Sequence, residues 1–244
     1  MRHTPHFLMT DVAEVRRLIA ANPWATIVSH TAAGLVASHY PVLLDTTASA
    51  DTDTDTDTDT DTDTDEIVLV SHVGRPDEVA HELGQHEVLV VFQGPHGYVS
   101  PAWYPPEQFV PTWNHVTAHC WGTPEILSDE ENFRVLGELV DHFERVMPEP
   151  VSLEVDEQTA RGMAKGTVGI RIRVTRFDAR AKLSQNKAPE VVERIVAGLR
   201  GDGPYASPAL ADEMARAHAV RADDREARGP RRRSRADAPA ADRP

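Results

Sequence analysis

An aromatic segment, Phe92 to Trp121, holds the side chains best suited to bind a planar ligand. It contains three of the four Trp residues, two of the four Tyr residues and the only Cys, Cys120, among closely spaced Pro and Gly residues. Large flat rings beside rigid turns can form a shallow, preformed pocket. The simpler interpretation is that these rings pack in a core or an interface, as most aromatic side chains do. Residue chemistry alone leaves both interpretations open.

A second group of candidate residues lies where a short strand, Ile67 to Ser71, runs into a helix. His72 and Arg75 follow the strand, and Pro76 suits the first helical position. Free backbone N–H groups at a helix start, together with a guanidinium group, form an anion cradle. An ordinary capped helix with a surface Arg is the alternative.

Two histidines, His115 and His119, have the spacing of a zinc pair on a helix. The segment Val110 to Trp121 has the alternation of a strand, however, and no nearby carboxylate completes a ligand set. We therefore predict no metal site, and we interpret Cys120 as a small core residue. No phosphate-binding glycine loop, catalytic triad or helix-turn-helix signature is recognisable, and no catalytic residue is assigned.

The elements that position these residues are mostly strands. A helix is predicted over residues 10–22, with Asp11 as its N-cap. Strands follow over Trp24 to His30 and Leu35 to Asp45, and Pro41 predicts an edge or a bulge because proline cannot donate to a ladder. Further strands are expected over 67–71, 87–93, 110–121 and 167–177, and helices over 128–147, 156–164 and 189–200. In the helix over 128–147, the predicted apolar stripe is Phe133, Leu136, Val140 and Phe143.

Composition divides the chain into one large domain, residues 1–200, and a tail, residues 201–244. Residues 51–65 alternate Asp and Thr and are predicted to form a disordered loop insertion in the domain. In the tail, a helix is expected near Pro208 to Val220 and disorder after Asp223.

Charge and cysteine content restrict the partners. The formal charge is −14, and it is −6 without the eight Asp of residues 51–65, which disfavours binding to nucleic acid. The only concentrated basic run is Arg228 to Arg235, so nucleic acid is not supported by charge. One Cys, no apolar leader and no apolar run of about 18–20 residues predict a cytoplasmic protein without a membrane partner.

Five short segments share an order and a spacing that indicate one family. They are PHF (5–7), NPWAT (22–26), GLVASHYPVLLD (34–45), FQGPHGYVSPAWY followed by VPTWNH (92–104 and 110–115), and KLSQN (182–186). Together they closely resemble the PaiB-like family, the FMN-binding negative transcriptional regulators. The resemblance covers roughly residues 1–199.

The resemblance implies an α+β fold, an antiparallel split β-barrel of Greek-key type with peripheral helices. It also implies a homodimer that binds FMN noncovalently in the groove between its subunits. The implied FMN-binding residues are Ser38, His39, Tyr40 and Pro41 along the isoalloxazine ring, Ser71, His72 and Arg75 at the phosphate, Trp113 and Asn114 near the flavin, and Lys182, Ser184, Gln185 and Asn186 near the same pocket.

The chain departs from the family pattern at the phosphate corner. Family members carry Gly-His-x-Ala-Arg-Ala-Asn-Pro there, whereas this chain reads SHVGRPD from Ser71 to Asp77. A Lys expected after the SPxWY segment is replaced by Pro106 and Glu107, and Glu107 would repel a phosphate. Whether this corner retains FMN is therefore left open.

The leading hypothesis is an FMN-binding split-barrel protein of the PaiB type that regulates transcription. The first alternative is an FMN-dependent oxidoreductase, an NAD(P)H:flavin or small-molecule reductase, whose regulatory effect is indirect. The second is a haem or flavin sensor without turnover, with His39 or His72 at the ligand. Fold alone does not choose among them.

Overall fold

The computed structural model describes residues 4–45, 47, 66–106 and 110–228. Its contacts define two compact units, one comprising Met1–His96 and Trp113–Lys182, the other Gly97–Thr112 and Leu183–Pro244. Each unit is described by itself. The predicted loop over 51–65, Glu107 and the end of the predicted disordered tail, from residue 229, lie outside the described residues. The predicted domain boundary at residue 200 stays a prediction.

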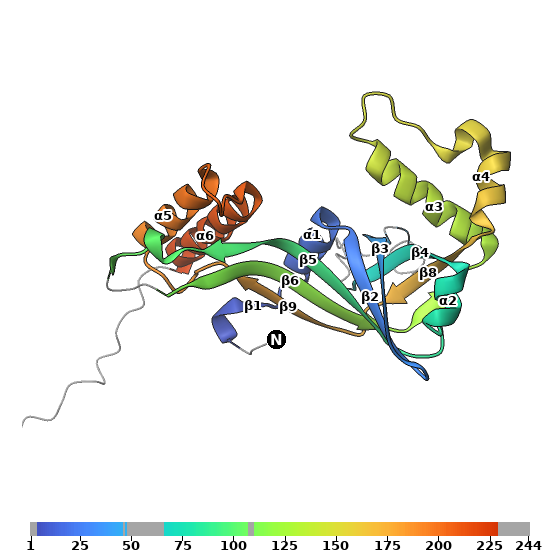
Figure 1. The fold of residues 1–244 in the computed structure, drawn as a ribbon, viewed down its shortest axis with the longest axis horizontal. Coiled ribbons are helices and arrows are strands. Elements are labelled where there is room, and N and C mark those ends of the chain that lie inside the picture. The colour runs from blue at the N-terminus through green and yellow to red at the C-terminus, as the bar shows by residue number, and fades with distance from the viewer. Residues whose placement is uncertain (1–3, 46, 48–65, 107–109, 229–244) are drawn as a thin grey trace, which may run out of the picture. The chain divides into compact units, whose positions relative to one another are not determined.

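Figure 1 shows the strands and helices of the chain. The strands are β1 (Leu8–Met9), β2 (Trp24–Thr31), β3 (Gly34–Leu44), β4 (Val68–Gly74), β5 (Val88–Val99), β6 (Thr112–Gly122), β7 (Pro124–Ile126), β8 (Thr167–Arg173) and β9 (Arg176–Lys182). The α-helices are α1 (Val12–Ala21), α2 (Arg75–Ala80), α3 (Asp129–Glu144), α4 (Glu157–Ala164), α5 (Pro189–Arg200) and α6 (Pro208–Arg228). Short 3₁₀ turns are η1 (Pro5–Phe7), η2 (Pro101–Trp103) and η4 (Leu153–Asp156).

The strands form one nine-stranded sheet in the order β1-β9-β6-β5-β2-β3-β4-β8-β7. The neighbours with a defined register are antiparallel, from β1 with β9 at one edge to β7 with β8 at the other. This confirms the predicted antiparallel α+β split-barrel class.

The predicted single strand over residues 167–177 is wrong. It is two strands, β8 and β9, which pair with β4 and β6 respectively. At the junction the Val174 N–H donates to Ile67 O, and the Thr175 N–H donates to Trp121 O, both at 2.9 Å. The alternation of apolar and polar side chains continues through the junction, so the change of partner strand cannot be recognised from the sequence pattern.

Strand β3 also changes partner, and it does so at Pro41. Residues 34–41 pair with β2, and residues 42–44 pair with β4. The predicted edge or bulge at Pro41 is thus a crossover between two ladders, where a residue without an N–H leaves no donor unpaired. The Pro41 carbonyl accepts from Ser71 Oγ at 2.7 Å, and the next N–H, of Val42, reaches Pro23 O at 2.8 Å.

Helix α1 covers one face of the sheet. As predicted, Asp11 caps it by accepting from the Ala13 N–H at 2.9 Å. Its buried residues are Val15, Leu18 and Ile19. A Cβ added at Gly94 on β5 would lie 2.6 Å from Leu18 Cδ1, so a larger residue there would require the Leu18 side chain to shift. The face under α1 is therefore closed.

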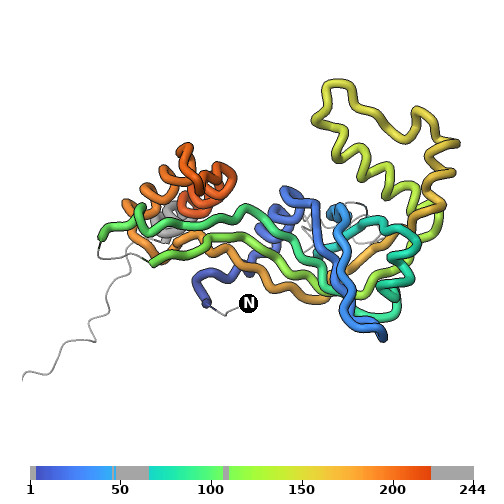
Figure 2. The backbone as a smooth tube through the Cα atoms, in the orientation of Figure 1, coloured from blue at the N-terminus to red at the C-terminus, as the bar shows by residue number. Residues whose placement is uncertain are grey.

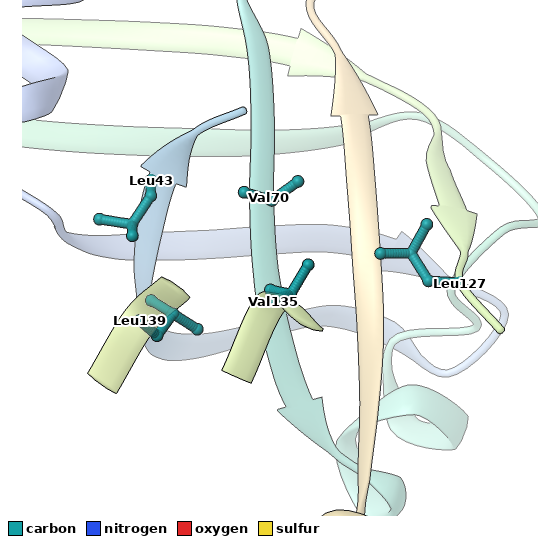
Figure 3. Close-up of a cluster of buried hydrophobic side chains, with 5 residues drawn as sticks. All are labelled: Leu43, Val70, Leu127, Val135 and Leu139. Carbon is teal, nitrogen blue, oxygen red and sulfur yellow. The ribbon is translucent and has the colours of Figure 1, made fainter. Parts of the chain in front are cut away.

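Helix α3 closes another part of the core. A capping box begins the helix, with Ser128 and Glu131 bonded reciprocally. The predicted apolar stripe is wrong, because the buried positions are Asn132, Val135 and Leu139. Figure 3 shows Val135 and Leu139 packed against Leu43, Val70 and Leu127. The predicted Leu136 and Val140 instead line an apolar cavity of about 450 Å³ between α3 and α4.

Arg171 on β8 forms ion pairs with three acidic side chains from different segments of the chain. Its Nε lies 2.9 Å from Asp45 Oδ2, its NH2 lies 3.4 Å from Glu131, and its NH1 lies 3.6 Å from Glu125. The Asp45 side chain is fully buried. Burial raises the pKa of Asp45, but hydrogen bonds from Thr47 and Arg171 outweigh it, so that the pKa lies below its usual value.

In the second unit, α5 and α6 pack against each other (Figure 2). Gly198 on α5 lies under the indole of Trp103, where a Cβ would come within 2.3 Å of the ring.

Among the described residues, no helix is long and apolar enough to cross a membrane.

Replacing Asp45 with Asn should lower the free energy of unfolding by about 3 kcal/mol, because it leaves Arg171 without its buried counter-charge. Urea unfolding at pH 7 measures this loss. Glu125→Gln, which removes an exposed partner of the same Arg171, should cost less than about 1 kcal/mol. Equal losses of unfolding free energy in the two variants would show that the buried Asp45–Arg171 pair contributes no more than the exposed Glu125–Arg171 pair.

The Asp45 carboxylate also predicts a pH dependence. Because its pKa in the folded state is depressed below the usual 3.8, its contribution is complete above pH 4 and is lost as the pH falls through the folded-state pKa. The wild-type protein should therefore lose more stability than Asp45→Asn during acidification below pH 4.

Candidate functional site

The predicted isoalloxazine strand, Ser38 to Pro41, places its side chains on two faces. Successive residues of a strand point to opposite sides of the sheet, so Ser38 and Tyr40 share one face and His39 lies on the other. Ser38 and Tyr40 are half-buried, whereas His39 is exposed. The four residues therefore do not line one surface together.

Ser38 and Tyr40 meet the β4–α2 corner through a hydrogen-bond network. The Tyr40 hydroxyl donates to Asp77 Oδ2 at 2.7 Å and accepts from the Gly74 N–H at 3.1 Å. Ser38 bonds to Asp77 and, at 3.0 Å, to Nε2 of His81. Nδ1 of His81 lies 2.7 Å from the Ser29 hydroxyl. We call Ser38, Tyr40, Gly74, Asp77 and His81 the corner network.

The direction of the hydrogen bonds follows from the charge of Asp77. Hydrogen bonds from Tyr40 and Ser38 lower the pKa of Asp77, so it is ionised at neutral pH and only accepts. Ser38 then donates to Asp77, His81 donates from Nε2 to Ser38, and Nδ1 accepts from Ser29. Burial lowers the pKa of His81, and burial also raises the pKa of Tyr40, so both stay neutral.

Asp77 and His81 were not recognised in the sequence. Their signal was available: they are four residues apart on the predicted helix that starts at Pro76, so they share one face of it. Nothing in the sequence indicated that this face meets β3.

His72 lies beside the corner network. Its ring contacts the Tyr40 ring edge-on, with centroids 6.0 Å apart. Among the described residues its buried Nδ1 has no hydrogen-bond partner, and burial lowers the pKa of the ring. Ser71, one residue earlier, is buried and donates to Pro41 O, so it supports the backbone at the partner change of β3.

Arg75 turns away from the corner network. Its Nε donates to Lys165 O at 2.6 Å, and its terminal nitrogens lie 3.8 Å from Glu78 and 3.7 Å from Asp129. Its backbone N–H donates to Gly166 O at 3.1 Å. The Nε of the guanidinium predicted for a phosphate is thus used within the chain, while about half of the side chain, 49%, stays exposed.

The sheet face opposite α1 carries the exposed aromatic rings. Trp24 on β2 stacks on His39 of β3, with ring centroids 6.5 Å apart and planes at 17°. His39 Nδ1 lies 3.0 Å from Thr26 Oγ1. Trp24 is 65% exposed and Trp113, on β6, 57%. We call this surface the open face.

Because of the same alternation, the residues of the VPTWN motif lie on both faces of the sheet. Trp113 lies on the open face, whereas Asn114 is fully buried on the face covered by α1. Lys182 on β9 pairs in register with His115, and its Nζ donates to Trp113 O at 2.6 Å. The open face therefore combines flat rings with a cation and imidazoles.

Ser184, Gln185 and Asn186 belong to the second unit. There Tyr104, which is buried, bonds to Ser184, and the Lys187 ammonium lies 5.2 Å from the centre of the Tyr104 ring. Gln185 Oε1 accepts from the Leu183 N–H at 2.8 Å, and Asn186 is exposed. The SPAWY and KLSQN segments thus meet, although about 80 residues separate them.

Ser184 has φ of +62°, a left-handed conformation that non-glycine residues rarely adopt. Such strain is held by surrounding contacts and is concentrated at functional sites.

Within the described ranges, no group of three or more His, Cys, Asp or Glu residues is placed to hold a metal ion. Burial raises the pKa of Cys120 to about 12, so its thiol is not ionised.

The sheet has the split-barrel fold. The fold is shared with the FAD and heme binding protein from Mycobacterium smegmatis, at a TM-score of 0.50 and 15% identity, over 81% of each chain. The family described as "Putative FMN-binding domain" matches residues 1–176, and the chain belongs to this family.

A curated relative agrees with this assignment. The protease synthase and sporulation protein PAI 2 of Bacillus subtilis (strain 168) is 28% identical over 185 residues, which are 75% of this chain and 81% of that protein. The predicted PaiB-like membership and the predicted flavin class of cofactor are confirmed at the level of the family.

His72 predicts a pH dependence of stability. Because the folded state depresses its pKa below 6.5, its neutral form contributes full stability above pH 6.5, and this is lost as the pH falls. His72→Phe, which keeps a ring beside Tyr40, should lose less free energy of unfolding between pH 7 and pH 5 than the wild type. Denaturant unfolding at both pH values measures the difference. His30→Phe, at an exposed position, is the control and should retain the wild-type dependence.

Proposed function

We propose that this chain binds FMN noncovalently and forms a homodimer in which the flavin lies against the open face. The observation that carries the proposal is the pair of exposed rings, Trp24 and Trp113, on the sheet face opposite α1. Exposed apolar side chains gathered on one face mark an interaction site. Leu35, 77% exposed on β3, extends the same surface.

The residues of the open face suit an isoalloxazine ring. Trp24 and His39 already stack on each other, so a planar ring system finds preformed flat surfaces there. Membership in the FMN-binding family supports flavin as that ring. A second copy covering the face would exclude water from it and would bury Trp24, Leu35 and Trp113.

When bound, FMN supplies hydride or electron transfer, and the chain supplies binding and orientation. Lys182 on β9 brings a positive charge next to Trp113, and burial lowers its pKa. A cation near the ring favours the reduced, anionic form of a flavin. The role of Lys182 is therefore to tune the ligand electrostatically.

For the biological role, we propose negative regulation of transcription in the cytoplasm, supported by the resemblance to the PaiB-like regulators. An FMN-dependent oxidoreductase is the second candidate. The formal charge of −14 favours the second, because an acidic chain is repelled by DNA phosphates.

The visible absorption spectrum of the purified protein tests flavin binding. We expect the bands of oxidised flavin, and a released ligand with the mass of FMN. A colourless protein that also fails to take up added FMN and riboflavin would contradict the proposal. A Soret band after addition of haem, lost in His39→Ala, would favour the haem alternative instead.

Trp113→Ala should weaken both flavin binding and self-association, flavin binding by about fivefold, because one exposed aromatic contact contributes about 1 kcal/mol. Flavin fluorescence quenching and sedimentation velocity are the measurements. Phe143→Ala removes a comparably exposed ring from α3 and should change neither. Loss of neither property in Trp113→Ala would place the flavin elsewhere.

Turnover and DNA binding separate the two roles. Steady oxidation of NAD(P)H by the flavin-loaded protein, without binding to a promoter fragment, would identify an oxidoreductase. Salt-sensitive binding to that fragment, lost on deletion of Arg231 to Arg235, would identify direct regulation.

A further inference from the structure

The cavity between α3 and α4 shares no residue with the corner network or the open face. Its volume of about 450 Å³ falls within the usual range of small-molecule sites, about 300–1,000 Å³. It is about three times the volume of an apolar cavity that holds one benzene molecule, about 150 Å³. The apolar side chains of its wall include Leu136 and Val140 from α3, Leu153 and Val155 from η4, and Ala160 and Met163 from α4.

Several apolar side chains that line this cavity are largely exposed to solvent. Val155 is 78% exposed, Met163 74% and Val151 56%. Exposed apolar side chains that gather around one hollow mark an interaction site. A ligand with an apolar body would remove these side chains from water, which favours its binding.

The polar residues that line the cavity have hydrogen-bond partners within the chain. Ser152 Oγ accepts from the backbone of η4 at 3.3 Å, and the Thr167 hydroxyl donates to the carbonyl of Ala164 at 2.8 Å. Asp156 accepts from the side chain of Thr159 and, at 3.1 Å, from its N–H. Because these groups are already bonded, the wall is suited to an apolar body and not to a polar one.

Asp156 is the only charged residue among those that line the cavity, and its side chain is exposed. Hydrogen bonds from Thr159 lower the pKa of Asp156, so this carboxylate is ionised at neutral pH. Among the described residues it has no ion-pair partner. A positive group at the exposed edge of the cavity would therefore meet an uncompensated negative charge.

The surrounding segment is strongly acidic as well. From Asp129 to Lys165, which includes α3 and α4, the chain has ten acidic and four basic residues, a net charge of −6. Without this segment and residues 51–65, the rest of the chain is neutral overall. The positive end of α4 lies near Asp156 but amounts to only about half a charge. The field at the cavity thus attracts cations and repels anions.

We propose that the cavity between α3 and α4 binds an amphiphilic cation, a small molecule whose apolar body fills the cavity and whose positive group lies beside Asp156. The proposal is independent of the proposed flavin binding. A neutral molecule with the same body gains only the apolar contacts and binds more weakly. An anion with the same body is repelled and binds most weakly.

Three octyl compounds separate the apolar contribution from that of charge. Octyltrimethylammonium, 1-octanol and octyl sulfate share one alkyl chain and differ in the charge of the head group. Isothermal titration calorimetry with the full chain, far below micellar concentrations, measures the dissociation constants. Octyltrimethylammonium should bind about tenfold more tightly than octanol, and octyl sulfate more weakly than octanol. Equal affinities for octyltrimethylammonium and octyl sulfate would overturn the proposal.

Asp156→Asn tests where the positive group lies, because it removes the charge and keeps a side chain that can cap α4. It should weaken the binding of octyltrimethylammonium about fivefold and leave the binding of octanol unchanged. Asp141→Asn is the matched control, since it removes an exposed carboxylate of α3 that does not line the cavity. It should weaken binding less than about twofold. Equal losses in the two variants would show that only net charge matters and would overturn the proposal.

Ala160→Leu tests where the apolar body lies, because a larger side chain at this half-buried position fills part of the cavity. It should weaken the binding of octyltrimethylammonium and of octanol about tenfold each. Gln158→Leu, at an exposed position of α4 outside the cavity, should retain both affinities. The melting temperatures of the ligand-free variants check that each one is folded. Unchanged affinities in folded Ala160→Leu would place the ligand elsewhere and overturn the proposal.

A second copy of the chain is the competing occupant of this surface. Met163→Glu places a charge among the exposed apolar side chains and would disrupt such an interface. The proposal predicts that self-association, measured by sedimentation velocity, is the same in Met163→Glu and in the wild type. A wild type that does not bind octyltrimethylammonium overturns the proposal. Loss of self-association in Met163→Glu would then assign the cavity to a second copy.

Discussion

The exchange of partners in β3 at Pro41 is the constraint on which the first unit depends. Up to Pro41 the strand belongs to the ladder with β2, and beyond it to the ladder with β4. Proline suits this point because it needs no acceptor, while its carbonyl is used by Ser71. The crossover brings Tyr40 against the β4–α2 corner and carries Val42 and Leu43 into the core. A change in this register would separate both the site and the core from their partners.

The corner network shows how an anion-binding composition can become a structural one. Ser, His, Arg and a helix start are the ingredients of a phosphate site, but the Ser71 hydroxyl and the Arg75 Nε donate to carbonyl groups of the chain itself. The first turn of a helix favours negative charge whether a ligand or a side chain supplies it.

The two faces of the sheet thus differ in how far they are exposed. The face under α1 is closed by Val15, Leu18 and Ile19, and Gly94 allows the close approach. The opposite face keeps Trp24 and Trp113 exposed. Exposing large rings costs solubility unless a ligand or a second chain covers them, which is why the open face carries the proposed function. In the second unit, the strained Ser184 beside Tyr104 marks a further place where local strain is retained.

Much of this architecture was predictable from local sequence. The Asp11 cap, the capping box at Ser128 and Glu131, and the strands around His39 and Val116 follow from short-range hydrogen bonding and from alternation. The ordered motifs were sufficient to identify the family. Alternation along a strand also implies that His39 and Tyr40 lie on opposite faces, and that Trp113 and Asn114 do so too, because neighbours on a strand must point to opposite sides of the sheet.

Other features were decided only by the tertiary structure. The division of residues 167–177 into β8 and β9 depends on which strands accept the N–H groups of Val174 and Thr175. The choice of Val135 and Leu139 over Leu136 and Val140 depends on where α3 meets the sheet. Asp77 and His81 became part of the site because α2 docks against β3. The sequence by itself determined which groups can donate, accept or pack; the fold decided which partner each one meets, because hydrogen bonds and contacts between distant segments depend on their positions in space and leave no periodic trace in the chain.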